Sequence, residues 1–501
     1  MRGIFSSRID QRAAIVDFVR EAARDKKTIE WGPIDITIDA AARIRGRQGI
    51  TVPSGTSWVM HPETRIRALP NAATHYTILD ITDVENIKIA GNGARIIGDR
   101  YAHGSSEGEW GFGVSLRGAR NVYLRDLVVE DCWGDSFYIG SGKLKYCQDI
   151  VLENTKSFRA RRNGLSLISA RGFASRCHES FDTGGTAPQA GIDIEPNHPL
   201  EYLEDITFEN ASTIRSNGIG LGVYLNALEK TPNPISITLS DCSDEASLIG
   251  FSVSAAKQIA GSIKFIRPTS KNAMEAGISL RGKSLSGPLV TLQKPKIMDW
   301  NQGNAKSAAA SSALCIFAAK KDGGDEQLGK VDIINPHISI TSGRLKPTAA
   351  IFARDHRRKV SKEVTDIRII DPSDLAQLRV FLAAERAQFY DTFGVSRRVL
   401  RSTNFVLKTS NIFCHNFIDV DGLGNYQIGL GHPVGIVLRF ELINEKSAAS
   451  IALLGNETFD FTDGTAGSSL TSAELGAAVA LVKIRDQKWQ IIEMVKDWHV
   501  E

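Results

Sequence analysis

The chain has 501 residues and a formal net charge of +3 at pH 7, with 23% charged and 42% hydrophobic residues. This ordinary globular mix excludes a chain dominated by disorder, and the small charge gives no support to a nucleic-acid partner. No apolar run approaches the ~20 residues of a membrane span, so no membrane partner is expected. A chain of this length needs either several domains or one elongated repeat.

The N-terminal residues bear on secretion, and the cysteines bear on whether disulfides or a zinc site are expected. The first ten residues lack the apolar core and the cleavage site of a signal peptide, so conventional secretion is not indicated. The six cysteines lie far apart without a C-x-x-C pair, which favours buried free thiols over disulfides or a zinc site. We expect no metal and no cofactor.

The first predicted element is an amphipathic helix over residues 10–24. Asp10 can cap it. Its apolar residues recur at helical spacing, at Ile15, Phe18, Val19 and Ala22. We assign residues 1–82 to this helix and the first strands, and expect the helix to cap the repeat that follows.

Two short strand patterns alternate between residues 83 and 372. The first often begins with a polar residue and places apolar residues at alternate positions, as in 85–89, 120–124, 148–152, 204–208 and 235–239. The second follows a small residue, usually Gly, as in 113–116, 164–167, 191–194, 218–221 and 277–280. We interpret this Gly as the residue that permits the turn into the strand.

Each of these coils is too small to have a core of its own, so the coils must stack. Stacking places Val122, Ile150, Ile206, Ile237 and Ile263 at equivalent positions. The step from Ile150 to Ile206 (206 − 150 = 56) is twice the step from Val122 to Ile150 (150 − 122 = 28), so one first strand is unrecognised, near 172–177. The connectors are too short for the helices of a doubly wound fold. The pattern predicts an all-β, right-handed parallel β-helix over 83–372.

The last part of the chain has a different pattern. Residues 373–403 are predicted to form a helical linker, because Ser373 can cap a helix. The apolar residues of that helix are Leu375, Leu378, Leu382 and Phe389. From 404 to 501, strands separated by Gly, Asn and Asp predict a C-terminal antiparallel β-sandwich.

Five segments of the chain point to one superfamily: 10–15, 91–98, 132–140, 162–169 and 184–197. They resemble the pectate-lyase-like β-helix proteins, and most closely the tailspike-type polysaccharide depolymerases of bacteriophages and prophages. The resemblance implies a polysaccharide substrate and an extracellular or virion-associated protein. It also implies a terminal β domain for trimerisation or sugar binding, so a homotrimer is expected.

The aligned second strands supply the candidate catalytic residues. They place Ser115, Tyr138, Ser166, Asp193 and Gly220 in one outward column and Arg117, Gly140, Ile168, Glu195 and Gly222 in the next. Glycoside hydrolysis needs two carboxyl groups, and Asp193 and Glu195 share one face, ~6.6 to 6.8 Å apart along the strand. Asp135 lies two coils from Asp193, ~9.6 Å away. Both separations favour an inverting mechanism. The alternative for each acid is a hydrogen bond to turn amides or an ion pair with Arg.

A wider set of residues is predicted to bind substrate: Glu109, Trp110, Trp133, Tyr138, Arg162, Asn163, His178 and Asp182. The tryptophans could stack on sugar rings, or be buried instead. His178 and Asp182 lie in the loop before Asp193 and could complete the site. The nearby arginines, at 159, 161, 162, 171 and 176, could bind uronate carboxylates or pair internally with acids.

Three functions follow from this reading. The leading hypothesis is a glycoside hydrolase that cleaves a bacterial surface polysaccharide or exopolysaccharide in a groove along the β-helix. The first alternative is a polysaccharide lyase acting on a uronate-containing polymer. The second is a non-catalytic, glycan-binding adhesin or receptor-binding protein.

Overall fold

The computed structural model describes residues 10–318, except 45, 229–232, 256–257, 284–286 and 308, then residues 330–339 and short strands from 349 onward. The chain divides into two compact units. One comprises Met1–Val331 and His337–Lys362, and the other comprises Asp332–Pro336 and Glu363–Glu501.

The first unit opens with helix α1 (Arg12–Arg24), close to the predicted range. Its apolar face is buried, and Phe18 meets the edge of the Trp31 ring with centroids 6.2 Å apart. The buried guanidinium of Arg12 donates to the backbone oxygens of Ala42, Arg47 and Gly49. These contacts hold α1 against the first coil, and its role as a cap stays a prediction.

The strands of this unit form three parallel sheets, which we name A, B and C. Sheet A contains β1 (Ile29–Trp31), β4 (Ser57–Met60), β7 (Glu85–Ala90), β10 (Arg120–Arg125), β13 (Cys147–Glu153), β16 (Ala170–Arg176), β19 (Leu203–Glu209), β22 (Ile235–Ser240), β25 (Gly261–Ile266) and β28 (Leu289–Gln293). Sheet B contains β2 (Asp35–Ile38), β5 (Arg65–Ala68), β8 (Arg95–Ile97), β11 (Val128–Glu130), β14 (Lys156–Phe158), β17 (Glu179–Phe181), β20 (Ser212–Ile214), β23 (Ser243–Glu245), β26 (Thr269–Lys271), β29 (Lys296–Met298) and β32 (His337–Ser339). Sheet C contains β3 (Ile50–Thr51), β6 (His75–Thr82), β9 (Trp110–Arg117), β12 (Phe137–Gly140), β15 (Leu165–Leu167), β18 (Ile192–Ile194), β21 (Ile219–Tyr224), β24 (Ile249–Ser254), β27 (Ile278–Lys283), β30 (Ser312–Ala318) and β33 (Ala349–Arg354).

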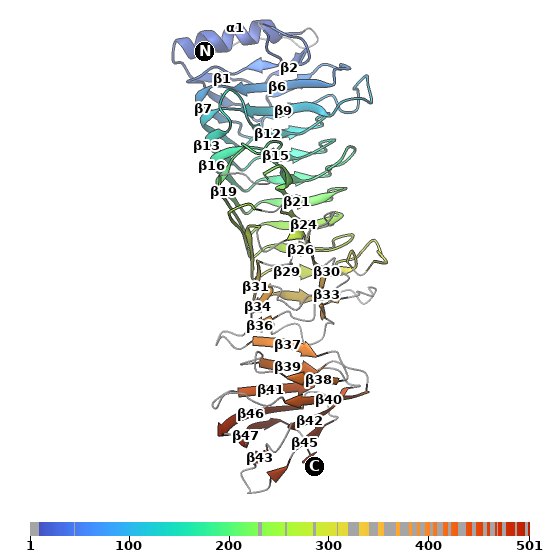
Figure 1. Cartoon of the computed structure of the whole chain (residues 1–501). Helices are drawn as coiled ribbons and strands as arrows, with labels where there is room; N and C mark the ends of the chain where they lie inside the picture. Colours follow the sequence, from blue (N-terminus) through green and yellow to red (C-terminus); the bar gives the residue numbers. More distant parts are fainter. Residues whose placement is uncertain are drawn as a thin grey trace. The chain divides into compact units, whose positions relative to one another are not determined.

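Each strand pairs in parallel with the equivalent strand of the next coil, so the predicted right-handed parallel β-helix is confirmed (Figure 1). Val122 pairs with Ile150, Ile150 with Phe173, and Phe173 with Ile206. The unrecognised strand is therefore β16, within the region where the spacing placed it. The stack begins at Ile29, earlier than the predicted start at residue 83.

A column of glycines before the sheet C strands packs against inward side chains of sheet B. The sheet B column is buried and consists of Ser157, Ser180, Thr213, Asp244 and Ser270. A Cβ at Gly164 would lie 2.1 Å from Ser180 Oγ, and one at Gly191 would lie 2.5 Å from Thr213 Cγ2. Neither glycine has a positive φ. The predicted role of these glycines in a turn is therefore wrong: close packing between two sheets requires them.

The second unit differs from its prediction. Strands β35 (Val380–Leu382) and β36 (Gln388–Tyr390) occupy the range for which the sequence predicts a helix, and the residues between them lie outside the described part. The expected antiparallel sandwich over 404–501 is also wrong in its first half. Strands β38 (Asn404–Leu407), β40 (Gly422–Ile428) and β42 (Ser447–Leu453) pair in parallel.

The other strands of this part begin with β31 (Val331–Ile334), β34 (Ile367–Ile370), β37 (Ser396–Leu400), β39 (Cys414–Ile418), β41 (Val437–Leu442) and β43 (Thr458–Asp460). The last strands in chain order are β44 (Ala466–Gly467), β45 (Ser469–Ser472), β46 (Ala478–Arg485), β47 (Lys488–Val495) and β48 (His499–Val500). Antiparallel pairing joins β41 to β46 and β46 to β47. The division of the chain into the four predicted domains stays a prediction.

The cysteines bear on the predicted thiol state. Among the described residues, Cys132, Cys147, Cys242 and Cys315 are buried free thiols, as expected. Cys177 is also a free thiol, but it is exposed.

The interior carboxyl of Asp244 predicts a pH dependence of stability. Thr213 and Ser247 donate to Oδ1, Oδ2 has no partner among the described residues, and burial raises the pKa to about 7. Since the folded-state pKa exceeds the unfolded value, the free energy of unfolding is highest below pH ~4 and falls as pH rises to ~7, by up to about 4 kcal/mol. Asp244→Asn should remove most of this fall in urea titrations at pH 5 and 8. An identical fall in wild type and variant would contradict the prediction, and Asp182→Asn is the exposed control.

Candidate active site on the outer face of sheet C

The outer face of sheet C carries a continuous column of side chains. Ile192 and Ile194 of β18 face the core, and Asp193 between them points outward. The register aligns Asp193 with the outward residues Ser115, Tyr138, Ser166, Gly222, Ser252 and Ser279. The predicted column is therefore correct up to Asp193 and wrong beyond it, where Gly222 replaces Gly220.

The error in register has a local cause. Residues 218–222, at the start of β21, read Gly-Ile-Gly-Leu-Gly, and any of the three glycines could be the one that packs against the interior. Gly220 takes that position, because its Cβ site lies 2.1 Å from Asp244 Oδ1 in the interior. Gly222 therefore faces outward beside Asp193, and the ring of Tyr224 covers it.

Asp135 is the fully buried anchor of the site. Arg162 Nη1 lies 3.2 and 3.3 Å from its two carboxylate oxygens, Ser166 Oγ donates at 2.8 Å and the Asn163 N–H donates at 3.2 Å. Burial raises the pKa of Asp135, and the charge of Arg162 opposes that rise. Asp135 thus makes the ion pair and turn hydrogen bonds that the sequence left open as an alternative to catalysis.

Asn163 links this anchor to Asp193. Its Nδ2 donates to Asp193 Oδ2 and to Ser166 Oγ, both at 3.0 Å, and its Oδ1 accepts from the Ala190 N–H at 3.0 Å. All its polar atoms are used within the fold. The predicted substrate-binding residue Asn163 therefore holds a catalytic candidate in place from the neighbouring coil.

Asp193 differs from Asp135 in having an unused oxygen. The side chain is 1% exposed, and Oδ1 has no hydrogen-bond donor among the described residues. Burial, the charge of Glu195 and a hydrogen bond with Glu195 hold the pKa of Asp193 well above its usual range, against the opposing charge of Arg162. The neighbouring acid and burial thus both favour the protonated form of Asp193.

Arg162 connects these acids to Glu109. Its Nε lies 3.4 Å from Glu109 Oε2, and the Glu109 side chain is 34% exposed. Burial lowers the pKa of Arg162, but the charges of Asp135, Asp193 and Glu109 outweigh it and the net direction is upward. Arg162 is therefore a permanent cation inside the site.

Two tyrosines lie on the same outer face. Tyr138 stands in the column of Asp193, under the guanidinium of Arg117, which is 4.3 Å from the ring centroid. Tyr224, which the sequence analysis missed, follows Gly222 by two residues and packs its ring over it. Burial raises the pKa of Tyr224 to about 12, and the charges of Asp193 and Glu195 add to the rise. If the sequence alignment of the strands had placed Gly222 beside Asp193, Tyr224 would have been found on the same face.

Trp133 is buried, so the predicted sugar platform at this residue is wrong. His103 stacks on one part of the ring system at 4.0 Å, and the Arg161 guanidinium lies 3.7 Å from its centroid. Trp110 is 46% exposed and follows Glu109, so its predicted contact with sugar stays open to test.

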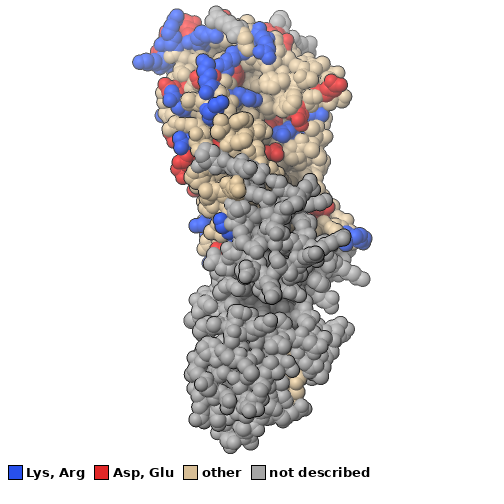
Figure 2. All heavy atoms as spheres, viewed as in Figure 1, with Lys and Arg blue, Asp and Glu red and all other residues tan. Residues whose placement is uncertain are grey.

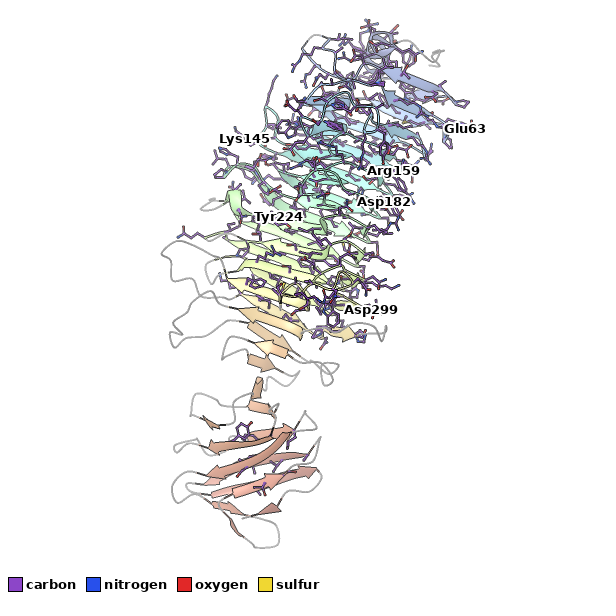
Figure 3. The ribbon with its side chains drawn as sticks, turned by 90° about the vertical axis from the view of Figure 1, so that its right-hand side faces the viewer. Glu63, Lys145, Arg159, Asp182, Tyr224 and Asp299 are labelled. Carbon is purple, nitrogen blue, oxygen red and sulfur yellow. The ribbon has the colours of Figure 1, made fainter. Side chains whose placement is uncertain are left out.

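His178 and Asp182 do not belong to the site. His178 is buried in the interior, where Nδ1 lies 2.9 Å from Thr155 Oγ1 and burial lowers its pKa to about 3. Asp182 pairs with Arg215 at 2.7 Å at the end of a sheet B strand. Figure 3 shows Asp182 and Tyr224 toward different sides of the stack.

The predicted arginine cluster is neutralised by its neighbours. Arg159 pairs with Asp131 at 2.7 Å, Arg171 with Glu204 at 2.6 Å and Arg176 with Glu209 at 3.5 Å. In Figure 2, Lys and Arg likewise lie among Asp and Glu on the visible face of the described part. Of these arginines, Arg162 is the one that reaches Asp135 and the acids of the site.

The described residues meet neither the requirements of a metal site nor those of a membrane-spanning helix. No group of three or more His, Cys, Asp or Glu side chains there could hold a metal ion. The helices in those ranges include none with the length and apolar character needed to cross a membrane.

Comparison with known proteins gives two curated relatives. No family model matches the chain. The SPbeta prophage-derived uncharacterized protein YorA of Bacillus subtilis is 31% identical over 198 residues, or 34% of this chain and 32% of that protein. The uncharacterized protein YclG of the same strain is 32% identical over 218 residues, or 38% and 37%. The chain thus spans about a third of the length of these relatives.

A solved structure supports the fold. The A-module of mannuronan C-5 epimerase AlgE6 from Azotobacter vinelandii matches with a TM-score of 0.54 and 14% identity, over 72% of this chain and 88% of that chain. At this identity the likeness concerns the fold alone. That fold agrees with the parallel β-helix that the sequence predicts.

The buried pair of Arg162 and Asp135 predicts a test of the site's stability. Arg162→Met leaves the Asp135 carboxyl buried without its counter-charge, which should lower the free energy of unfolding by about 3 to 5 kcal/mol. The loss should be greater at pH 8 than at pH 5, because Asp135 can take up a proton at the lower pH. Urea titrations at both pH values measure it.

The matched control is Arg176→Met, which removes an exposed pair with Glu209 and should cost at most about 1 kcal/mol. Equal losses in the two variants would show that the buried network does not depend on Arg162.

Proposed function

We propose that the outer face of sheet C hydrolyses glycosidic bonds in a bacterial surface polysaccharide or exopolysaccharide. The observation that carries this proposal is the state of Asp193, which is buried, has a free Oδ1 and is held with a raised pKa beside Glu195. A carboxyl whose pKa is raised by burial and by a neighbouring acid can serve as the general acid that glycosidic cleavage requires.

The two acids take complementary roles in this mechanism. Asp193 protonates the leaving oxygen, and Glu195, on the same face and ~6.6 to 6.8 Å along the strand, activates water. The hydrogen bond between Asp193 and Glu195 brings their carboxyl groups closer together than this spacing along the strand, so the inverting mechanism stays a prediction. Asp135, with its oxygens bonded to Arg162, Asn163 and Ser166, acts as a positioning residue.

The biological setting follows from the same proposal. The prophage-derived relative supports a phage or prophage origin, and with it a tailspike-type depolymerase that is extracellular or virion-associated. We retain the homotrimer as part of this proposal. Light scattering that finds a monomer at all concentrations would exclude it.

The two alternative functions, lyase and adhesin, can be distinguished from hydrolysis by what happens to the polymer. A polysaccharide lyase would release unsaturated uronates, and ion pairs with acids occupy Arg159, Arg171 and Arg176, three of the five arginines on which that alternative relied. A glycan-binding adhesin would bind without shortening the polymer. Hydrolysis gives new reducing ends with no new ultraviolet absorbance.

The first functional prediction concerns Asp193→Asn and Glu195→Gln. Each variant should lose at least ~100-fold in the rate of reducing-end release, because each removes one partner of the acid–base pair. The assay uses a panel of bacterial capsular polysaccharides and follows chain length by size exclusion. Asp182→Asn, which alters an exposed pair remote from the site, should retain full activity.

Unsaturated products would replace the hydrolase with the lyase, and full activity in both acid variants would place catalysis elsewhere. A wild-type protein that binds but shortens no polymer of the panel would support the adhesin.

The second functional prediction concerns the pH profile. Activity should fall as pH rises through the pKa of Asp193, since the acid must be protonated. The charge of Arg162 lowers that pKa, so Arg162→Gln should move the alkaline limb of kcat to higher pH, whereas Arg162→Lys should leave it near its original position. An unmoved limb in Arg162→Gln would show that Asp193 is not the acid.

A further inference from the structure

Two arginines stand on the outer face of sheet C on either side of the acids. Arg117 ends β9 two residues after Ser115, and Arg281 lies in β27 two residues after Ser279. Each donates Nε to its own serine, Arg117 at 3.2 Å and Arg281 at 3.1 Å. The same local device therefore occurs twice in the stack.

The register places these two devices symmetrically about Asp193. On one side the column runs from Asp193 through Ser166 and Tyr138 to Ser115, and on the other through Gly222 and Ser252 to Ser279. Each serine is three strands from Asp193, which corresponds to ~14 Å at the spacing of neighbouring strands. The arginines thus bracket the acids along the direction in which the coils stack.

Neither of these two guanidinium groups has a carboxylate partner among the described residues, a property that they share with Arg161, which lies over the ring of the buried Trp133. Within 10–318, excluding the undescribed positions, no Asp or Glu lies at ion-pair distance from either one. Arg159, Arg162, Arg171 and Arg176 are all paired there. Arg117 is held instead by aromatic rings, 4.3 Å from the centroid of Tyr138 and 5.4 Å from that of Phe112.

We propose that Arg117 and Arg281 bind carboxylate groups of an acidic polysaccharide that runs along sheet C across successive coils. This inference rests on the proposed function and names the class of its substrate. The chain passes over Asp193 and Glu195, with one anionic sugar at each arginine.

The charge of the site supports this assignment. An anionic glycan on this face passes Glu195, whose negative charge also acts on Asp193, and two cations on the same face offset that repulsion. A guanidinium presents a planar fork that matches a carboxylate in two hydrogen bonds. The serine and ring contacts leave other N–H groups of each fork unassigned among the described contacts.

The test measures binding in the Asp193→Asn background, where cleavage is blocked and the full chain is retained. The probes are carboxylate-bearing capsular polysaccharides, with alginate, polygalacturonate and hyaluronan, against dextran of matched length. Arg117→Gln and Arg281→Gln should each weaken binding to the acidic probe roughly five- to tenfold and reduce its salt dependence. Arg117→Lys should keep part of the affinity, and Arg176→Gln should keep all of it.

The outcomes separate this inference from the proposed function. Acidic binding that falls in both variants, without cleavage by the unsubstituted protein, upholds the inference and rejects the hydrolase. Cleavage of a neutral polymer with no effect of either arginine rejects the inference and retains the hydrolase. Failure to bind any acidic probe, or equal affinity in all variants with unchanged thermal melts, also overturns the inference.

Discussion

The contact between the glycines that precede the sheet C strands and the inward side chains of sheet B fixes how the sheet C strands, and the side chains on their outer face, are placed. Gly191 can approach Thr213, and Gly220 can approach Asp244, because neither carries a Cβ. Asp193 follows Gly191 by two residues. The contact that brings the two sheets together therefore also fixes where Asp193 lies on the outer face of sheet C. The parallel register repeats this placement in every coil and aligns Asp193 with Ser166 and Gly222. The candidate site is thus a consequence of how the core packs.

Burial then gives the acids of this face different chemistry. Asp135 and Asp193 are similarly buried, yet Asp135 has its carboxylate oxygens bonded to Arg162, Ser166 and Asn163, whereas Asp193 has one oxygen free. A buried carboxyl with a cation and several donors serves as a fixed anion. One with an unpartnered oxygen beside a second acid has a raised pKa, as Asp193 does. The network therefore gives two acids that are distant in sequence different environments, and the proposed positioning and catalytic roles rest on that difference.

The repeat was predictable from the sequence because apolar alternation and coil length are local properties. They located the Val122 to Ile263 ladder and the unrecognised strand, now β16. Asp193 and Glu195 were found by the same alternation. Gly222 and Tyr224 were not, because several glycines in β21 left the register ambiguous, and only the contact with Asp244 decides it. The helix expected over 375–389 failed for another reason: its apolar residues fit a helical period, but strands β35 and β36 occupy part of that range.

The burial of Trp133 and the ion pairs of the arginines could not be predicted from the sequence, because both depend on residues of neighbouring coils. Trp133 is covered by His103 and Arg161, and the partner of Arg171 is Glu204, 33 residues further along the chain. In a β-helix, residues about one coil apart in sequence become neighbours ~4.8 Å apart in space, so an arginine's partner is set by coil length. A cluster of arginines in the sequence is therefore weak evidence for anion binding in this fold. The informative arginine is one whose register neighbours are Gly, Ser or aromatic residues. The register neighbours Thr82 and Gly140 of Arg117, and Ser254 beside Arg281, carry no carboxylate, which supports the proposal that these two arginines bind a ligand.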